Sequence, residues 1–319
     1  MMTAVLILNY NNADDTINCI RSIERFNTSP IKYVVVDNGS TRPGTVEAID
    51  TFLREQFPEA YQQRHIDTFP KEKLRHSNLL LNPVNSGYAV GNNKGLDWVF
   101  QDSDISGVLL LNNDILFKED ILPRLQEDSR TLERCGVITP LIYQKDGESV
   151  DSCCARKFVS NWRIMVPFAL HNRDLFGWIT RNSARQTVLP ERIRENRAPF
   201  PVDYPSGSCL YIDKDLFQSI GAFDPRTFLY YEEIILYKKL EAIGRQSYCD
   251  PSISVIHLGG SSTRMSDNSF LQQCNLDSAD IFLRQYGKMT LPQRLAWAMI
   301  RKSWELRLWL KKRLRRESR

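Results

Sequence analysis

The first half of the chain alternates short, almost continuously apolar runs with longer segments in which apolar residues recur at helical spacing. Near-continuous apolar runs of strand length are typical of buried parallel strands. Four such runs cover residues 4–8, 33–36, 78–81 and 107–111. The segments between them predict helices over residues 14–26, 45–56 and 89–100. Strands and helices in this alternation predict an α/β fold built on a mostly parallel, Rossmann-like sheet.

The second half is less regular. A predicted helix over residues 119–133 and a strand over residues 136–143 are followed by residues 144–200, which mix aromatic, Arg and Pro residues without a clear period. Long irregular stretches in enzymes are usually binding loops, so we expect the acceptor side of a site there. The remaining predicted elements are a strand over residues 202–213, a helix that ends near residue 243, and strands up to residue 260.

Polar side chains stand where the predicted strands end. Those after the first, second and fourth strands are Asn9 and Asn11, Asp37, and Asn112, Asn113 and Asp114. Ligands of open α/β sheets bind at the carboxyl ends of the strands. A carboxylate there, beside amides, suits a hard divalent cation that also carries phosphate oxygens. A simple turn with a polar cap explains the same residues equally well.

Two common nucleotide-binding motifs are absent from the sequence. No G-x-G-x-x-G follows the first strand, and no G-x-x-x-x-G-K-[ST] occurs. Dinucleotide dehydrogenases and phosphate-loop NTPases therefore lose their main support.

The length of 319 residues allows one large α/β domain with an appendage. The seven Cys are scattered without metal-site spacing, which favours reduced cytosolic thiols. We expect no signal peptide, because the chain starts almost directly with a strand. No apolar run is long enough to span a bilayer.

Positive charge is concentrated at the C-terminus. Residues 294–319 contain ten Lys or Arg and two Asp or Glu, a net charge of +8, which leaves −4 for the rest of the chain. This asymmetry argues against a nucleic-acid-binding fold and for a local basic segment.

The basic segment follows a predicted helix over residues 295–310. At about 100° per residue, we predict one apolar arc, with Arg301 and Lys302 opposite and Trp309 outside it. The residues assigned to the apolar arc are Trp297, Met299, Ile300, Trp304, Leu306, Leu308 and Leu310. An amphipathic helix with Trp and a polybasic end suits an anionic membrane surface. The alternative to a membrane-bound helix is one that packs on the α/β domain and leaves its charged end in solvent.

Taken together, several segments resemble a known family. They are VLILNYNN (5–12), VVVDNGS (34–40), NPVNSGYAVGNNKGL (82–96), LLLNNDILF (109–117), GSCLYIDKDLFQSIGAFDPRTFLYYEEIIL (207–236) and IHLGGSS (256–262). In this order they resemble the inverting glycosyltransferases of family 2, and within them the rhamnosyltransferase-like enzymes of bacterial surface polysaccharide synthesis. The resemblance implies a GT-A catalytic domain over residues 1–262, followed by a C-terminal helical extension over residues 263–319.

The resemblance also assigns residues to a nucleotide-sugar donor. Asp37 would contact the pyrimidine base, with Asn9 and Asn11 beside it. Asn85 and Gly87 would line the sugar-diphosphate pocket.

The family's metal-binding D-x-D motif corresponds here to Asn112, Asn113 and Asp114. The resemblance makes Asp114 the ligand of Mg or Mn, with His257 as a second ligand, and places Asn112 and Asn113 against the donor. Because the first carboxylate of the motif is an amide in this chain, the protein lends less negative charge to the cation.

The pair Glu232 and Glu233 aligns with the family's acidic pair, whose second member is the catalytic base. The resemblance therefore assigns Glu233 as the base, with Glu232 beside it. From the residues alone, an acidic pair at the start of a helix is explained by the helix dipole. Relatives usually carry Asp two positions after the base, and this chain has Ile235, so no supporting hydrogen bond is expected from there.

The resemblance implies transfer of a sugar, first of all rhamnose from dTDP-rhamnose, to a polyprenyl-diphosphate-linked saccharide in O-antigen or capsule synthesis. Such an enzyme would be cytoplasmic and peripheral on the inner face of the cell membrane, held there by its tail. A UDP-hexose donor is an alternative. A sugar-phosphate nucleotidyltransferase is another, although its usual Gly-rich, basic N-terminus is missing. An inactive membrane-bound assembly subunit is the non-enzymatic alternative, motivated by Asn112 and Ile235.

Overall fold

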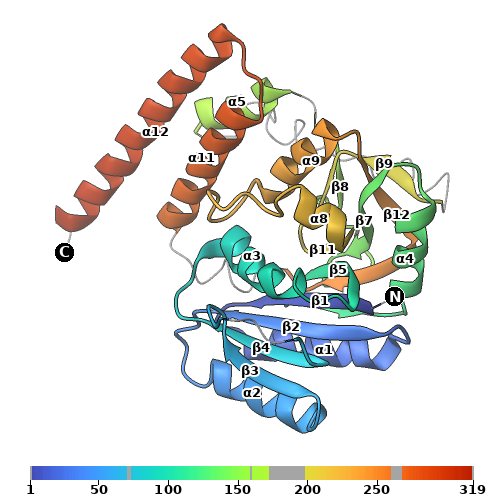
Figure 1. The fold of residues 1–319 in the computed structure, drawn as a ribbon. Coiled ribbons are helices and arrows are strands. Elements are labelled where there is room, and N and C mark those ends of the chain that lie inside the picture. The colour runs from blue at the N-terminus through green and yellow to red at the C-terminus, as the bar shows by residue number, and fades with distance from the viewer. Residues whose placement is uncertain (1, 70–72, 159, 172–197, 260–267, 318–319) are drawn as a thin grey trace.

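A computed structural model describes residues 2–69, 73–158, 160–171, 198–259 and 268–317 (Figure 1). Its centre is a ten-stranded sheet in the order β3-β4-β2-β1-β5-β11-β7-β12-β6, with β9 also paired to β12. Helices cover both faces of the sheet, and two long helices extend from one end of the molecule (Figure 1).

One half of the sheet is parallel. Its strands are β3 (Tyr61–His65), β4 (Ser77–Asn82), β2 (Ile31–Asn38), β1 (Met2–Asn9) and β5 (Ile105–Asn112). The helices between them are α1 (Ala13–Phe26), α2 (Thr45–Gln56) and α3 (Gly87–Val99). This half confirms the predicted alternation of strands and helices. Strand β3 was not predicted, because it is a short, polar edge strand without an apolar run.

The other half is mixed. Its strands are β11 (Cys209–Asp213), β7 (Cys135–Tyr143), β12 (Gln246–His257), β6 (Ile115–Phe117) and β9 (Phe200–Val202). Strand β11 runs antiparallel to β5 and to β7, whereas β12 runs parallel to β7 and antiparallel to β6. The helices of this half are α4 (Leu122–Thr131), α8 (Lys214–Ser219) and α9 (Glu232–Ala242).

The single strand predicted over residues 202–213 is wrong. The segment divides into β9, β10 (Tyr204–Pro205) and β11, and β10 pairs with β8 (Ala155–Arg156) in a separate two-stranded sheet. Pro205 has no N–H for a sheet ladder, and the turn after it carries Ser206 and Gly207 toward the pocket described below.

Alternating residues of the strands pack on opposite faces of the sheet. Val5 and Ile7 of β1 belong to one buried cluster together with residues of α1, α2 and α4. Ala4 and Leu6 belong to the other, with residues of α3, α8 and α9. Each fully buried aliphatic side chain contributes about 1.5–3 kcal/mol. The two clusters hold the sheet between helical layers and fix the ends of its strands.

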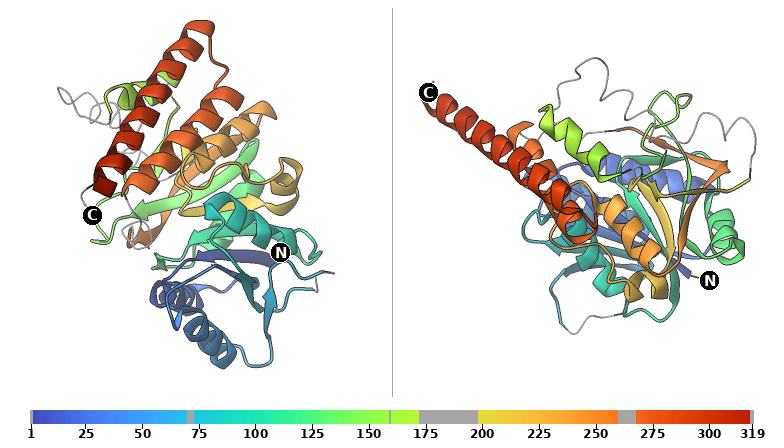
Figure 2. Two further views of the ribbon diagram at one scale, coloured as in Figure 1. Left: turned by 90° about the vertical axis from the view of Figure 1, so that its left-hand side faces the viewer. Right: turned by 90° about the horizontal axis from the view of Figure 1, so that it is seen from above.

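A third apolar cluster joins α5 (Asn161–Ala169), α11 (Asn268–Gln285) and α12 (Leu291–Glu317). Trp297 and Trp304 of α12 are each 1% exposed and pack edge-on against Phe168 of α5. Their indole N–H groups donate to Asp280 Oδ1 at 2.8 Å and to the Phe168 carbonyl at 2.6 Å. One side of the tail helix is therefore packed on the rest of the protein, and its C-terminal end projects outward (Figure 2).

The predicted apolar arc of the tail is wrong, because α12 has two apolar sides. Trp304 and Leu308 face the third cluster, whereas Met299, Leu306 and Leu310 are 68%, 59% and 45% exposed. The exposed apolar residues of α12 are Leu291, Leu295, Met299, Leu306, Trp309 and Leu310. Arg301, predicted to lie opposite the arc, pairs with Asp280 of α11 instead.

Two predictions fall wholly or partly outside the described residues. They are the domain boundary between residues 262 and 263, and much of the acceptor-side region over residues 144–200. The described part of that region contains β8 and α5, so it is less irregular than predicted. Within the described parts of the chain, no helix is long and apolar enough to cross a membrane.

Candidate active site

The ends of β1, β2 and β5 bring three predicted residues into one buried network. Asn9 lies opposite Asp37 in the β1–β2 register and donates to Asp37 Oδ1 at 2.7 Å. Asn113 donates to Asn9 Oδ1 at 3.3 Å. All three side chains are at most 5% exposed. Parallel strands align their carboxyl ends at one sheet edge, and the hydrogen bonds fix these polar groups there.

Asn11 is also at this edge, but its side chain holds a loop. Its backbone is left-handed, with φ of 58°. Its Oδ1 accepts from the amides of Thr41 and Arg42 at 2.7 and 2.8 Å. Asn11 therefore orders the segment that follows Asp37.

Asn85 and Gly87 form the start of α3. Asn85 Oδ1 accepts from Asn38 Nδ2 at 3.1 Å and from the Gly87 amide at 3.0 Å. Gly87 has φ of +82°, and a Cβ there would lie 2.3 Å from the carbonyl oxygen of Phe228. Tyr88 donates its amide to the same carbonyl at 2.7 Å. The glycine thus allows the start of α3 to touch the segment that leads into α9.

Strand β6 brings Asp114 and His257 together, although 143 positions separate them in the sequence. His257 is paired with Ile115 in the β6–β12 register, next to Asp114. Its Nε2 lies 3.3 Å from Asp114 Oδ1, and its Nδ1 lies 3.3 Å from Asp151 Oδ2. Burial opposes a charged imidazole, but the hydrogen bonds of the two carboxylates raise the pKa of His257 to about 9.

Asp151 is a member of this cluster that the sequence did not reveal. Its hydrogen bond with His257 lowers the pKa of its carboxyl group, against the opposing effect of burial. It lies in the region predicted to be irregular, and no motif distinguishes it there.

We tested whether these residues fit a divalent cation. Over the described parts of the chain, no group of three or more His, Cys, Asp or Glu side chains is placed to hold a metal. Asp114 and His257 do face each other as a pair. Magnesium sites commonly use one or two protein carboxylates and take their other ligands from water and substrate phosphates. Carboxylate oxygens suit Mg and Mn alike, whereas imidazole is a more typical ligand of later transition metals. Asp114 fits a metal site that a diphosphate completes, and His257 would join it as a neutral imidazole, giving up the proton that the two carboxylates favour.

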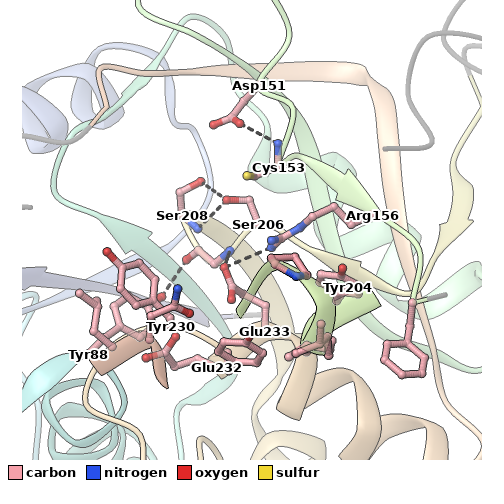
Figure 3. Close-up of a pocket in the computed structure, with 18 of the residues that line it drawn as sticks. Tyr88, Asp151, Cys153, Arg156, Tyr204, Ser206, Ser208, Tyr230, Glu232 and Glu233 are labelled. Carbon is pink, nitrogen blue, oxygen red and sulfur yellow. Dashed lines mark hydrogen bonds and ion pairs between the residues drawn. The ribbon is translucent and has the colours of Figure 1, made fainter. Parts of the chain in front are cut away.

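Beside this cluster lies a cavity of about 550 Å³ (Figure 3). Its lining includes Asn112, Asp151, His257, Glu232 and Glu233, and Asp151 lies across the pocket from the two glutamates (Figure 3). The remaining residues include Tyr88, Cys153, Arg156, Arg163, Tyr204, Ser206, Ser208, Tyr230 and Tyr231. The structure therefore brings the predicted metal-binding edge and the predicted acidic pair to one pocket.

The acidic pair begins α9 after an unusual turn. Tyr230 and Tyr231 have φ of 75° and 71°, a left-handed conformation that is uncommon outside glycine. Two such residues in succession cost about 1–3 kcal/mol each. The ring of Tyr231 packs against Phe282 of α11, 5.9 Å away, which holds the turn. The turn directs both glutamates into the pocket.

The two glutamates have different surroundings. Glu232 is 5% exposed, and its Oε1 has no hydrogen-bond partner within the described residues. Burial and, secondarily, the charge of Glu233 raise the pKa of Glu232 to about 8. Glu233 Oε1 accepts from the Gly207 amide at 3.2 Å and from Arg156 Nη2 at 3.3 Å. Both donors to Glu233 carry hydrogens that a carboxylate can accept, whereas burial favours the neutral form of Glu232.

Comparisons with known proteins identify the family of the chain. Residues 4–221 match the model of glycosyl transferase family 2. The chain is 27% identical over 279 residues to the N-acetylglucosaminyl-diphospho-decaprenol L-rhamnosyltransferase of Mycobacterium tuberculosis, covering 84% of this chain and 79% of the relative. It is 25% identical over 232 residues to the low-salt glycan biosynthesis hexosyltransferase Agl10 of Haloferax volcanii, covering 72% of this chain and 59% of the relative.

Among solved structures, the fold is similar to that of GalNAc-T7 with UDP, GalNAc and Mn²⁺. The TM-score is 0.56 at 14% identity, with 81% of this chain and 44% of that chain covered. This likeness supports the GT-A fold. Since the family model spans more than half of the chain, the protein belongs to glycosyl transferase family 2 and is a rhamnosyltransferase-like glycosyltransferase with a GT-A fold.

Proposed function

We propose that the protein transfers a sugar, with inversion, from a nucleotide sugar to a lipid-linked saccharide. The observation that carries the proposal is the single pocket that joins the Asp114–His257 edge to Glu232 and Glu233. A leaving diphosphate and an attacking hydroxyl must meet within one such space.

The first choice of donor is dTDP-rhamnose, because the mycobacterial relative is named as an L-rhamnosyltransferase. A UDP-hexose is the second choice. Asp37, Asn9 and Asn11 would hold the base, either directly or by ordering the loop after β2. Asn85, Gly87, Asn112 and Asn113 would line the sugar-diphosphate region.

Asp114 and His257 would hold Mg or Mn, and the bound cation would supply positive charge for the diphosphate that leaves. Asp151 would orient His257 through its Nδ1, since outer carboxylates commonly fix ligating imidazoles. His257 would then present Nε2 toward Asp114 and the pocket.

Glu233 would act as the general base. The acceptor oxygen forms a bond to the anomeric carbon, the bond from that carbon to the diphosphate oxygen breaks, and the hydroxyl proton moves to the Glu233 carboxylate. Attack from the face opposite the leaving group inverts the anomeric configuration. Glu232 is a poor base near pH 7, because burial keeps it protonated.

The acceptor would be a polyprenyl-diphosphate-linked saccharide of surface polysaccharide synthesis, O-antigen or capsule. Its support is the name of the mycobacterial relative, a transferase acting on N-acetylglucosaminyl-diphospho-decaprenol. Within the region predicted to be irregular, Arg156, Phe158 and Arg163 line the pocket. We place the acceptor beside these three residues.

We place the exposed side of α12 on the inner face of the cell membrane. At about 100° per residue, Leu295, Met299, Leu306 and Trp309 lie opposite the buried Trp304, and they are at least 53% exposed. Lys302 falls on the same side and is exposed. The net charge of +8 over residues 294–319 complements anionic lipid.

An inactive assembly subunit is the competing function. Ile235 is 1% exposed within the third apolar cluster, so the acid found there in relatives is replaced by packing. A binding and transfer assay separates the two functions. Ligand at 100 times its Kd stabilises a protein by about 2.7 kcal/mol, so dTDP-rhamnose with Mn²⁺ should raise the Tm by several degrees. It should also support transfer to a synthetic polyprenyl-diphosphate N-acetylglucosamine.

A panel of UDP-hexoses tests the second donor class in the same assay. Stabilisation without transfer would favour the assembly subunit. The absence of both stabilisation and transfer with all of these nucleotide sugars would contradict the proposed function.

A further inference from the structure

The carboxylate of Glu233 lies against a small structural unit that is separate from the main sheet. Strands β8 and β10 pair through Arg156 with Tyr204 and Ala155 with Pro205. Arg156 Nη2, from β8, and the amide of Gly207, two residues after β10, lie 3.3 and 3.2 Å from Glu233 Oε1. One carboxylate oxygen of Glu233 therefore accepts two hydrogen bonds.

A second contact, besides the one with Glu233, orients the guanidinium of Arg156. It lies over the ring of Tyr204, 4.5 Å from the centroid (Figure 3). The side chains of Arg156 and Glu233 are 20% and 23% exposed, and Arg156 Nε is buried without a hydrogen-bond partner among the described residues. Such a stacked, planar group loses little conformational freedom when it binds a carboxylate.

The contact between Arg156 and Glu233 takes the place of another that the family resemblance leads us to expect. An acid two positions after the base would lie at residue 235, but Ile235 is buried in the third apolar cluster. The support for Glu233 instead comes from a residue 77 positions earlier in the chain.

We propose that Arg156 is a positioning residue for Glu233, holding one carboxylate oxygen so that the other faces the acceptor hydroxyl. The inference rests on the proposed function of Glu233 as the base. Arg156 acts on the reaction through Glu233 and has no direct part in the chemistry.

The charges around Glu233 predict a signature in the pH profile. The titratable groups set against it are Glu232 on its own helix, Tyr88 on α3, Tyr204 on β10, Cys153 before β8, and Arg156. Of these five, Arg156 carries positive charge. Its removal should shift the acidic limb of the profile of kcat against pH to higher pH, because the ionised base then loses the positive charge that stabilises it.

The test compares Arg156→Met, Arg156→Lys and Lys157→Met in transfer from dTDP-rhamnose to polyprenyl-diphosphate N-acetylglucosamine. Lys157 is the matched control, an exposed cation next in sequence that does not line the cavity. Arg156→Met should lower kcat by about 10- to 100-fold, the usual worth of a hydrogen bond to a charged group. The KM for the donor should stay unchanged, and the acidic limb should move to higher pH.

Arg156→Lys should recover part of the loss in kcat, and Lys157→Met should behave as the wild type. In a Glu233→Gln background, Arg156→Met should lower kcat by less than about threefold, because coupled residues are not additive. A wild-type kcat and pH profile for Arg156→Met would overturn the inference. So would an equal loss in both backgrounds, which would place the action of Arg156 elsewhere.

Thermal melting accompanies each variant. If Arg156→Met does not fold, Arg156→Gln and Arg156→Lys decide the matter. The lysine variant must then turn over several-fold faster than the glutamine variant, and equal rates would overturn the inference. If Glu233→Gln alone keeps full transfer, the proposed base is wrong. If Glu233→Gln abolishes transfer while Arg156→Met has no effect, only the role of Arg156 is wrong.

Discussion

Glu232→Gln should make the protein more stable than the wild type between pH 7 and 9. Glu232 is 5% exposed, and burial beside Glu233 raises its pKa to about 8 from an ordinary value of 4.5. Between these pH values the folded protein keeps a proton that the unfolded chain releases. The free energy of unfolding therefore falls as pH rises through this window and levels off above about pH 8. Glutamine cannot ionise, so its variant lacks this loss.

The magnitude follows from the width of the window. One proton contributes about 1.4 kcal/mol for each pH unit. At pH 7 the wild type has therefore lost on the order of 3 kcal/mol of its free energy of unfolding through Glu232. The amide of glutamine replaces a neutral carboxyl whose Oε1 already lacks a partner among the described residues, so the substitution adds little new cost. We expect the variant to gain about 3–4 kcal/mol at pH 8 relative to pH 5.

Urea unfolding at intervals from pH 5 to pH 9 measures this difference. The two proteins should have similar stability near pH 5 and diverge as pH rises. Glu241→Gln is a control on the same helix: that side chain is exposed, and its pKa is lowered by Tyr237 and Lys238 despite some burial. Its variant should differ from the wild type by less than about 0.5 kcal/mol. Parallel curves for Glu232→Gln and the wild type would show that Glu232 is ionised in the folded protein, and would refute the reasoning.

Three further predictions concern the metal edge and the tail. Asp114→Asn should weaken Mn²⁺ binding in the presence of dTDP and lower transfer, because one of the two proposed ligands loses its charge; full activity of the wild type in excess chelator would contradict the metal assignment. Trp304→Ala should lower the free energy of unfolding, measured in urea, by about 3–5 kcal/mol, since Trp304 is 1% exposed. Trp309 is 53% exposed, and an equal loss for Trp309→Ala would contradict the two-sided helix. Leu306→Asn with Trp309→Asn should reduce sedimentation with anionic vesicles while Ile243→Asn, 51% exposed elsewhere, should not; unchanged binding of the double variant would rule out this face as the membrane contact.

The parallel half of the sheet could be predicted because its signals are local. The strand β5 is a continuous apolar run, and the boundaries of α2 match the predicted helix. Strand β6 has only three residues, from Ile115 to Phe117, too few for any periodicity. It nevertheless decides the site, because its pairing with β12 places His257 beside Asp114.

The partners of the site residues could not be predicted, since they depend on tertiary contacts between distant segments. Nothing near Glu233 in the sequence indicates Arg156, and nothing near His257 indicates Asp151. The resemblance named four residues that line the pocket, but not the groups that hold them; the four are Asn112, Glu232, Glu233 and His257.

The tail shows a limit of helical periodicity. The sequence places apolar residues around much of α12, and a single arc was an incorrect division of them. Only the packing of Trp297 and Trp304 against α5 separates the buried side from the exposed one. Removal of the whole helix would therefore expose this cluster, so point substitutions on the outer side test membrane binding more cleanly.

We propose above all that Glu233 takes the proton of the acceptor hydroxyl in the pocket that it shares with His257, the partner of Asp114. The most direct measurement is kcat for transfer by Glu233→Gln, made together with the affinity for the donor. We expect a fall of about 10²–10⁴-fold in kcat with donor affinity nearly unchanged, and a loss of less than about tenfold for Glu232→Gln. Transfer at the wild-type rate by Glu233→Gln, or its abolition by Glu232→Gln alone, would contradict the account.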